Sequence, residues 1–131
     1  MINRKVAVIF DEIANILDME DVPFKPSAYR KAALVLKGMN QDIEDVYKEG
    51  GKKTLIAMAG IGRSMADKIE EHINTGKIEY YNHLKKKIPV DVSQLMDVEG
   101  IGPKTIKILY KELKVKNLKD LKAVAKSGKI A

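Results

Sequence analysis

Apolar residues recur at three- and four-residue steps along most of the chain, which is the spacing of amphipathic helices. From Ile2 to Met19 one apolar stripe runs between polar positions and predicts a first long helix. A second helix is predicted from Pro26 or Ser27 to Gly38, because proline and serine suit a helix start and glycine a helix end. Runs of alternating β-branched or aromatic residues are absent, so we predict an all-α helical bundle.

Shorter helices are predicted further along the chain. Asn40 is a candidate cap for a helix that ends at Gly50 and Gly51. Beyond it we expect a helix that ends at Gly76, another from Ile78 towards Pro89, and a last one capped by Asn117.

An internal repeat begins after residue 50. The segment Met58-Ala59-Gly60-Ile61-Gly62-Arg63-Ser64 aligns with Val98-Glu99-Gly100-Ile101-Gly102-Pro103-Lys104, which follows 40 residues later. Each copy has an apolar approach segment, a Gly-Ile-Gly turn and a predicted helix. We therefore expect two units in the chain, each made of a helix, a hairpin turn and a second helix.

A glycine turn at a helix start suits an anion, because backbone amides and the helix dipole face a ligand that no side chain keeps away. Such a turn binds phosphate without reading bases, and we expect Ile61 and Ile101 to anchor the hairpins in the core. A solely structural role for both turns is the alternative. Four lysines share one face of the helix after the second turn, and they either bind phosphate or are simply solvated: Lys104, Lys107, Lys111 and Lys114.

The charge distribution adds to this picture. The net charge is +6 with a pI of 9.4, and the excess of basic residues lies after residue 50. With no cysteine and only His72 and His83 as imidazoles, a structural zinc site is excluded. No run of 18 apolar residues and no signal peptide are found, so we expect a soluble cytoplasmic protein.

The tandem hairpins, the stretch Ser27-Ala28-Tyr29-Arg30-Lys31-Ala32-Ala33 and the later Thr75-Gly76-Lys77 resemble the amino-terminal region of family X DNA polymerases, the polymerase beta family. The resemblance covers nearly the whole chain. It implies a lyase-like helical domain over residues 1–88 and the start of a duplex-binding domain over residues 89–131, with the boundary near Lys87 to Asp91. We expect a prokaryotic, monomeric member.

The resemblance implies DNA with a gap, a nick or a 5′ phosphate as the partner, and we expect the protein to be associated with the nucleoid when it is bound to DNA. The implied DNA contacts are Lys25, Gly60, Ile61, Gly62, Arg63, Ser64, Gly100, Ile101, Gly102, Lys104 and Lys107. The family also holds a potassium or sodium ion at each hairpin through backbone carbonyls. The matching positions are Ile56, Met58 and Ile61, then Met96, Val98 and Ile101.

In several family members the first domain is a lyase that removes a 5′-deoxyribose phosphate through a Schiff-base lysine, and the matching residue is Lys68. From its helical position we expect Lys68 at the rim of the core, near Ser64, with a pKa lowered by Arg63 and Lys25. The family alignment gives Lys25 the 5′ phosphate and places Tyr29 near the amine as a second catalytic residue, whose hydroxyl would orient the sugar. The alternative for Tyr29 is a core tyrosine with its hydroxyl at the surface. His72 is expected to be an exposed helix residue. This β-elimination needs no cofactor.

The sequence departs from the lyase pattern where the family has phosphate-binding residues: it has Phe24, Ile56, Ser64 and Tyr80. A non-catalytic tandem DNA-binding module is therefore the alternative, and a protein-binding helical scaffold is a third interpretation.

The carboxylates that hold magnesium in a polymerase also lack a counterpart, because the sequence has no Asp-x-Asp pair. We therefore expect the chain to be the amino-terminal part of a longer polymerase, with the magnesium site in the missing part.

Overall fold

The computed structural model describes residues 1–127, and all regular structure in that range is helical. The helices are α1 (Asn3–Met19), α2 (Lys25–Gly38), α3 (Ile43–Gly50), α4 (Lys52–Ala57), α5 (Arg63–Thr75), α6 (Glu79–Lys87), α7 (Val92–Met96), α8 (Pro103–Leu113) and α9 (Leu118–Lys126). The all-α prediction is confirmed. The last four residues of the predicted second domain, 128–131, lie outside the described residues.

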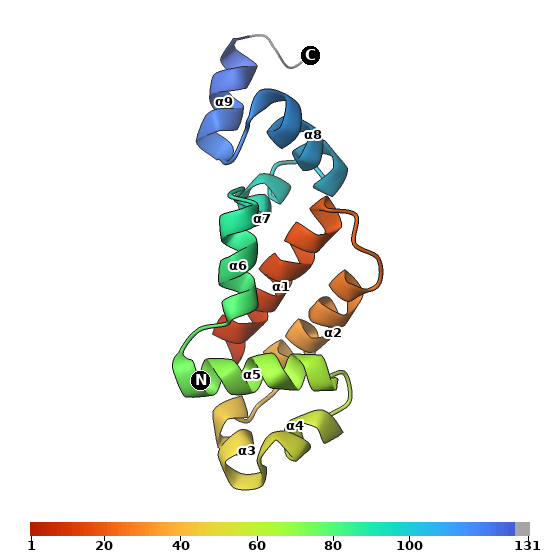
Figure 1. Ribbon diagram of the computed structural model, residues 1–131, viewed down its shortest axis with the longest axis vertical. Helices are drawn as coiled ribbons and strands as arrows, with labels where there is room; N and C mark the ends of the chain where they lie inside the picture. Colours follow the sequence, from red (N-terminus) through yellow and green to blue (C-terminus); the bar gives the residue numbers. More distant parts are fainter. Residues whose placement is uncertain (128–131) are drawn as a thin grey trace.

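Helix α1 is the centre of the molecule (Figure 1). Its apolar stripe, including Val6, Phe10 and Ile13, is fully buried, as the periodicity predicts. Helix α2 lies alongside α1, and Lys37 pairs with Asp11 at 2.5 Å across the two helices. Helices α6, α7 and α8 also contact α1, so this helix joins the first half of the chain to the second.

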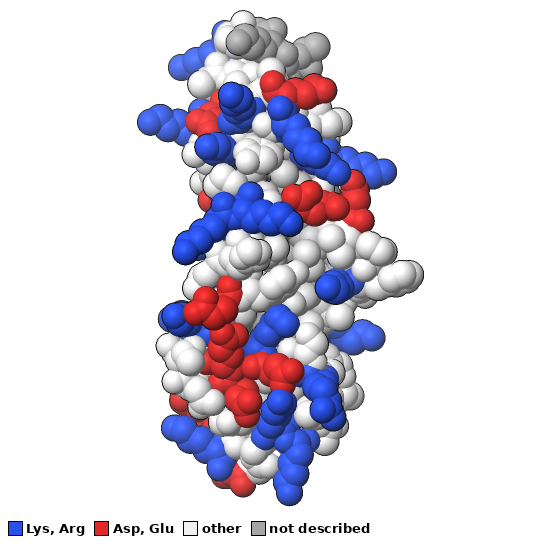
Figure 2. Space-filling view, in the orientation of Figure 1, with Lys and Arg blue, Asp and Glu red and all other residues white. Residues whose placement is uncertain are grey.

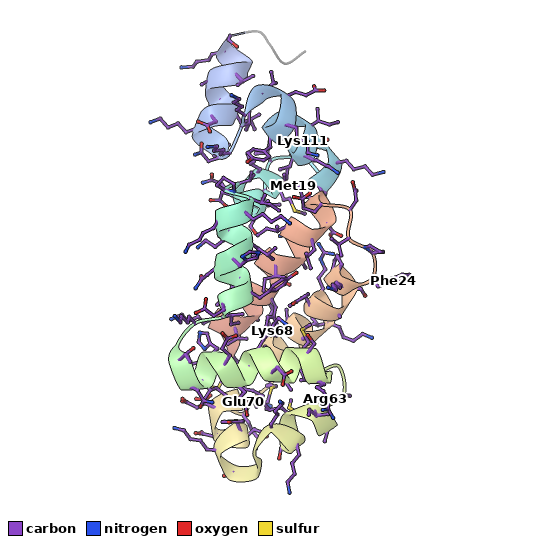
Figure 3. All side chains as sticks on the ribbon, in the orientation of Figure 1. Met19, Phe24, Arg63, Lys68, Glu70 and Lys111 are labelled. Atoms are coloured by element: carbon purple, nitrogen blue, oxygen red, sulfur yellow. The ribbon has the colours of Figure 1, made fainter. Side chains whose placement is uncertain are left out.

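The connection from α1 to α2 is tight and carries unusual backbone angles. Asp21 and Phe24 have φ of 59° and 65°, values that residues other than glycine rarely adopt. The second helix begins at Lys25, slightly earlier than the predicted start, with Pro26 in its first turn, where a missing N–H costs least. Phe24 is 90% exposed and points away from the core (Figure 3).

The cap of α3 differs from the prediction. Asp42, not Asn40, caps the helix, and its Oδ1 accepts a hydrogen bond from the Glu44 amide at 3.0 Å. The buried Asn3 side chain fixes this corner by donating to the Gln41 carbonyl at 2.8 Å and accepting from the Ile43 amide at 2.9 Å. A contact across 38 residues leaves no local pattern, which explains why the sequence does not reveal it.

One hydrophobic core runs through both halves of the described chain. Buried apolar residues form a single cluster from Val6 in α1 to Val115 after α8. Helices α3 and α4 lie at one end of the elongated molecule and α9 at the other (Figure 1). The predicted cap of α9 is confirmed, because Asn117 accepts a hydrogen bond from the Asp120 amide at 2.8 Å. Among the described helices, none has the length and apolar character needed to cross a membrane.

Candidate functional site

The first Gly-Ile-Gly turn connects α4 to α5. The Ile61 amide donates to the Met58 carbonyl at 3.1 Å and closes the turn, and Gly60 has a φ of 89°. Gly62 is the residue before α5, with an extended backbone of φ −85° and ψ 178°. Ile61 is 3% exposed, so its predicted role as the anchor of the hairpin is confirmed. Lys52 of α4 also pairs with Asp67 of α5, which ties the two helices of this hairpin together.

The second turn, between α7 and α8, repeats the first. The Ile101 amide donates to the Val98 carbonyl at 3.1 Å, and Gly100 has a φ of 82°. Gly102 precedes α8 with a φ of −113° and a ψ of −178°. Ile101 is only half-buried and packs at the edge of the core, so the anchoring prediction is met less fully than at Ile61. The sequence repeat is therefore also a repeat of backbone geometry.

The two glycines of each turn have different reasons to be glycine. Gly60 and Gly100 have positive φ, which disfavours any side chain. Gly62 and Gly102 have ordinary extended angles, and a Cβ at either position would meet nothing within 4 Å. Neither backbone nor packing demands glycine at these second positions. Their lack of a side chain instead leaves the first amides of α5 open to a ligand. At α8 it leaves open the amides from Lys104 onward, because Pro103 at the start of that helix has no N–H.

The surroundings of the first turn are basic. The hollow beside it is lined by Ala28 and Lys31 of α2 and by residues 60–65 of the hairpin, including Arg63 and Ser64. Lys31, Arg63 and Ser64 are exposed, as is Lys25 at the start of α2. Two cations and the amino-terminal end of α5 therefore face the same hollow, which favours an anion.

The surroundings of the second turn are mixed in charge. The hollow beside it is lined by Asp18 of α1, by Asp21 and Val22 in the connection that follows α1, and by residues 102–105. Lys107 donates to Asp21 at 2.7 Å, and this hydrogen bond, with the charges of Lys107 and Lys104, lowers the pKa of the Asp21 carboxyl. Figure 2 shows acidic side chains among basic ones where α1 ends beside α8. The lysine face predicted on α8 is thus partly neutralised by Asp21, in the connection that follows α1.

Lys68 lies on α5, on the side of the helix that faces α1 and α2 (Figure 3). Its side chain is half-buried, so the predicted rim position is confirmed, and its Nζ donates to Ser64 Oγ at 3.1 Å. The same Nζ lies 5.6 Å from the ring centroid of Tyr29 and 5.3 Å from that of Tyr80. The sequence drew attention to Tyr80 only as a departure from a family pattern, and no local spacing reveals its contact with Lys68.

The environment lowers the pKa of the Lys68 amine. Burial is the largest cause, and the charge of Lys25 adds to it, while the nearby Asp67 and Glu71 carboxylates oppose the shift. The expected contribution of Lys25 is therefore present. Arg63 is not among the groups that shift this pKa, and it instead assists Lys52 in lowering the pKa of the Asp67 carboxyl.

Two further residues near Lys68 are buried. Tyr29 is 3% exposed and packs edge-on against Phe10 with ring centroids 5.6 Å apart, and burial raises the pKa of its phenol. His72 is 5% exposed, so the prediction of an exposed His72 is wrong. Neither ring nitrogen of His72 has a hydrogen-bond partner, and burial, with the charge of Lys5, lowers the pKa of the imidazole.

Metal-ligating side chains do not cluster within residues 1–127: no group of three or more His, Cys, Asp or Glu residues could hold a metal ion there. Backbone carbonyls at the turns are a different kind of donor. The Met58 and Val98 carbonyls each accept one turn hydrogen bond, and a carbonyl oxygen has a second lone pair.

Both hairpins lie in segments that match known protein families. Residues 1–78 match the family described as "Helix-hairpin-helix domain", and residues 90–129 match "SAM-like Helix-hairpin-helix tandem". The chain is 30% identical over 131 residues to the "DNA polymerase/3'-5' exonuclease PolX" of Bacillus subtilis (strain 168), an alignment that covers 99% of the chain and 22% of that protein.

Two eukaryotic proteins named "DNA polymerase lambda" also match. The protein from Arabidopsis thaliana is 32% identical over 92% of the chain and 22% of its own length. The protein from Rattus norvegicus is 23% identical over 94% of the chain and 20% of its length. The chain thus spans about a fifth of the length of these relatives. The expected resemblance to the amino-terminal region of family X DNA polymerases is confirmed.

Proposed function

This chain belongs to the helix-hairpin-helix domain family, and we propose that it binds the DNA backbone at gaps, nicks or 5′ ends during repair. The observation that carries the proposal is the pair of matched turns. In each, the second glycine is required by neither backbone angles nor packing and leaves helix amides open to a phosphate oxygen. Because amides and lysines meet phosphates and not base edges, binding is independent of sequence.

The names of the relatives support this proposal. The proteins from Bacillus subtilis and Arabidopsis thaliana are named as DNA polymerases, and their alignments cover nearly all of this chain. The polymerase reaction itself, with its magnesium ions, belongs by this proposal to other parts of such proteins.

The proposal includes a potassium or sodium ion at each turn. The carbonyls of Ile56, Met58 and Ile61 would hold it at the first turn, where the free lone pair of Met58 is available. The carbonyls of Met96, Val98 and Ile101 are the counterparts at the second turn. When bound, the cation would add positive charge for a DNA phosphate to that of the helix amides and the neighbouring basic side chains.

The proposal also includes an enzymatic activity, a 5′-deoxyribose phosphate lyase that acts through Lys68. The neutral amine attacks the C1′ aldehyde carbon of the opened sugar, and loss of water leaves an iminium ion between Nζ and C1′. A base then removes a C2′ proton, and the electrons of that C–H bond form a C1′=C2′ enamine. The enamine electrons next form a C2′=C3′ double bond as the C3′–O bond breaks, which releases the 3′ phosphate. Lys25 holds the 5′ phosphate, and Ser64 and Tyr29 orient the amine.

The geometry around Lys68 supports this chemistry. A lysine nucleophile must be neutral to attack, and partial burial together with Lys25 lowers the pKa of this amine. The hydrogen bond to Ser64 fixes the position of Nζ beside the first turn, where a bound phosphate would lie.

A non-catalytic DNA-binding module is the second candidate. Ile56, Ser64 and Tyr80 stand where family lyases carry phosphate-binding lysines, so the pocket for a 5′ phosphate has fewer charges. Under this alternative Lys68 is only a phosphate contact, and both turns keep their role.

Binding is tested by fluorescence anisotropy with a labelled gapped duplex, prepared in two unrelated sequences and titrated at rising salt. We expect similar affinities for the two sequences and a linear fall of log affinity with log salt, because lysines release condensed counterions. Affinity that is insensitive to salt, or that differs strongly between the sequences, would overturn the proposal.

The lyase is tested by borohydride trapping on gapped DNA that carries a 5′-deoxyribose phosphate. We expect a covalent adduct with the unmodified chain and none with Lys68→Ala, while both bind the DNA with similar affinity at the same salt. Lys85→Ala is the matched control, because Lys85 is exposed on α6 and contacts Tyr81, away from the site. Tight binding without any adduct would leave the non-catalytic module as the function.

A further inference from the structure

We propose that Tyr80 is a positioning residue for Lys68: with Tyr29 it forms a two-ring platform that shields the amine and carries the cationic nitrogen of the Schiff base. The catalytic use of this platform rests on the lyase proposed above. The platform itself is a property of the folded chain, so it can be tested without DNA.

The platform is built from three helices. Tyr29 comes from α2, Lys68 from α5, and Tyr80 from the first turn of α6. The two rings are stacked, with centroids 6.4 Å apart and planes 16° from parallel. The Nζ of Lys68 lies 5.6 Å from one centroid and 5.3 Å from the other, within the range in which ring faces attract a cation.

The rings restrain the side chain of Lys68. Tyr29 is held by the core, where it packs against Phe10, and Tyr80 is half-buried against it. Nζ donates a hydrogen bond to Ser64 Oγ at 3.1 Å, and the two rings beside it occupy space that water would fill around an exposed amine. An amine held in one place loses less freedom when it bonds to the sugar.

The platform also suits the charge of the intermediate. The nitrogen is cationic as an ammonium before attack, neutral when it attacks C1′, and cationic again as the iminium after water leaves. Ring faces attract the cationic forms, whereas a lysine at position 80 would repel them. Tyr80 therefore replaces a phosphate-binding charge with support for the reacting nitrogen.

Other charged groups around Nζ bear on its titration. Asp67 and Glu71 on α5 favour the ammonium, whereas Lys25 on α2 and burial disfavour it. Since water hydrates an ammonium more strongly than two ring faces attract it, shielding by the rings lowers the pKa of the amine overall.

The test compares Tyr80→Phe, which keeps the ring, with Tyr80→Ala, which removes it. The pKa of Lys68 is measured by NMR of lysine side chains labelled with carbon-13, with Lys68→Arg identifying the signal. We expect Tyr80→Phe to titrate like the unmodified chain. In Tyr80→Ala the pKa should rise towards that of an exposed lysine, because water reaches the amine. An unchanged or lower pKa in folded Tyr80→Ala would overturn the platform.

The second measurement follows the pH dependence of borohydride trapping. The midpoint for Tyr80→Ala should move to higher pH and its rate at pH 7 should fall roughly tenfold, since less amine is neutral and its position is less fixed. Loss of folded protein would lower the yield of adduct without moving the midpoint. If the unmodified chain forms no adduct, the lyase proposal fails, and the NMR titration still decides whether the platform exists. If the midpoint stays in place, Tyr80 does not position the amine.

Discussion

The two hairpins share one backbone and differ in what surrounds it. Both turns are closed by a 3.1 Å hydrogen bond and have a first glycine with φ near 85°. The first hairpin faces Lys31 and Arg63, whereas the second faces Asp18 and Asp21. Glycine positions thus determine the shape of each turn, and the side chains around it determine the local charge. The second hollow also contains Lys104, but there two carboxylates oppose the basic charge. We therefore expect the first hairpin to bind phosphate more strongly.

The helices after the turns differ in the same way. At the repeat distance of 40 residues, Lys68 of α5 corresponds to Ile108 of α8, which is 55% exposed. The second hairpin therefore has no amine at the position that could form a Schiff base. One copy of the repeat combines a proposed phosphate site with a candidate nucleophile, and the other has the proposed phosphate site alone.

The largest difference between the hairpins should appear in stability, through their first glycines. A Cβ at Gly60 would lie 2.7 Å from Val35 Cγ2 on a positive-φ backbone, whereas Gly100 has the same kind of backbone angle in open space. We expect Gly60→Ala to lower the free energy of unfolding by roughly 2–4 kcal/mol and Gly100→Ala by about 1–2 kcal/mol. Urea denaturation measures both, and equal losses would contradict the difference in packing.

The second glycines should separate the hairpins in DNA affinity. A methyl group at Gly62 or Gly102 has room in the free protein but meets an approaching phosphate. We expect Gly62→Ala to weaken binding to a gapped duplex roughly tenfold, about 1.4 kcal/mol, and Gly102→Ala about threefold. Fluorescence anisotropy measures both affinities. A larger loss from Gly102→Ala would show that the second hairpin dominates.

Asp21, beside the second hairpin, should weaken the binding of this hairpin to DNA. Asp21→Asn removes the carboxylate that pairs with Lys107 at 2.7 Å and frees this lysine for a phosphate. We expect an affinity gain of about threefold at low salt and a log–log salt dependence steeper by up to about 0.9. Asp45→Asn, at an exposed site on α3, serves as the control. An unchanged salt slope would mean that Lys107 does not reach DNA.

The helix of the first hairpin should respond to pH in a way that α8 does not. His72 is buried with a lowered pKa, whereas its counterpart 40 residues later, Glu112, is exposed. Below pH about 6.5 the unfolded chain binds a proton that the folded chain resists, so stability should fall as the pH falls. Thermal unfolding of His72→Leu should depend less on pH over this range. An identical pH dependence would exclude His72 as the cause.

The sequence predicts most of the helices and both turns, because these depend on local spacing. The periodicity of α1, the Gly-Ile-Gly pairs and the Asn117 cap are all readable within a few residues. The features that it misses are contacts between distant segments. Asp21 and Lys107 are 86 residues apart, and Tyr80, in the first turn of α6, contacts Lys68 of α5 and Tyr29 of α2, which are separate helices. Burial of His72 likewise depends on tertiary packing.

The most direct test of the two-hairpin account is an NMR titration of the backbone amides with a gapped duplex that carries a 5′ phosphate. We predict the largest shifts at Gly62, Arg63 and Ser64, smaller ones at Gly102 and Lys104, and little change in α3. Shifts that gather on α3 or α9 while the amides of both turns stay in place would contradict the account.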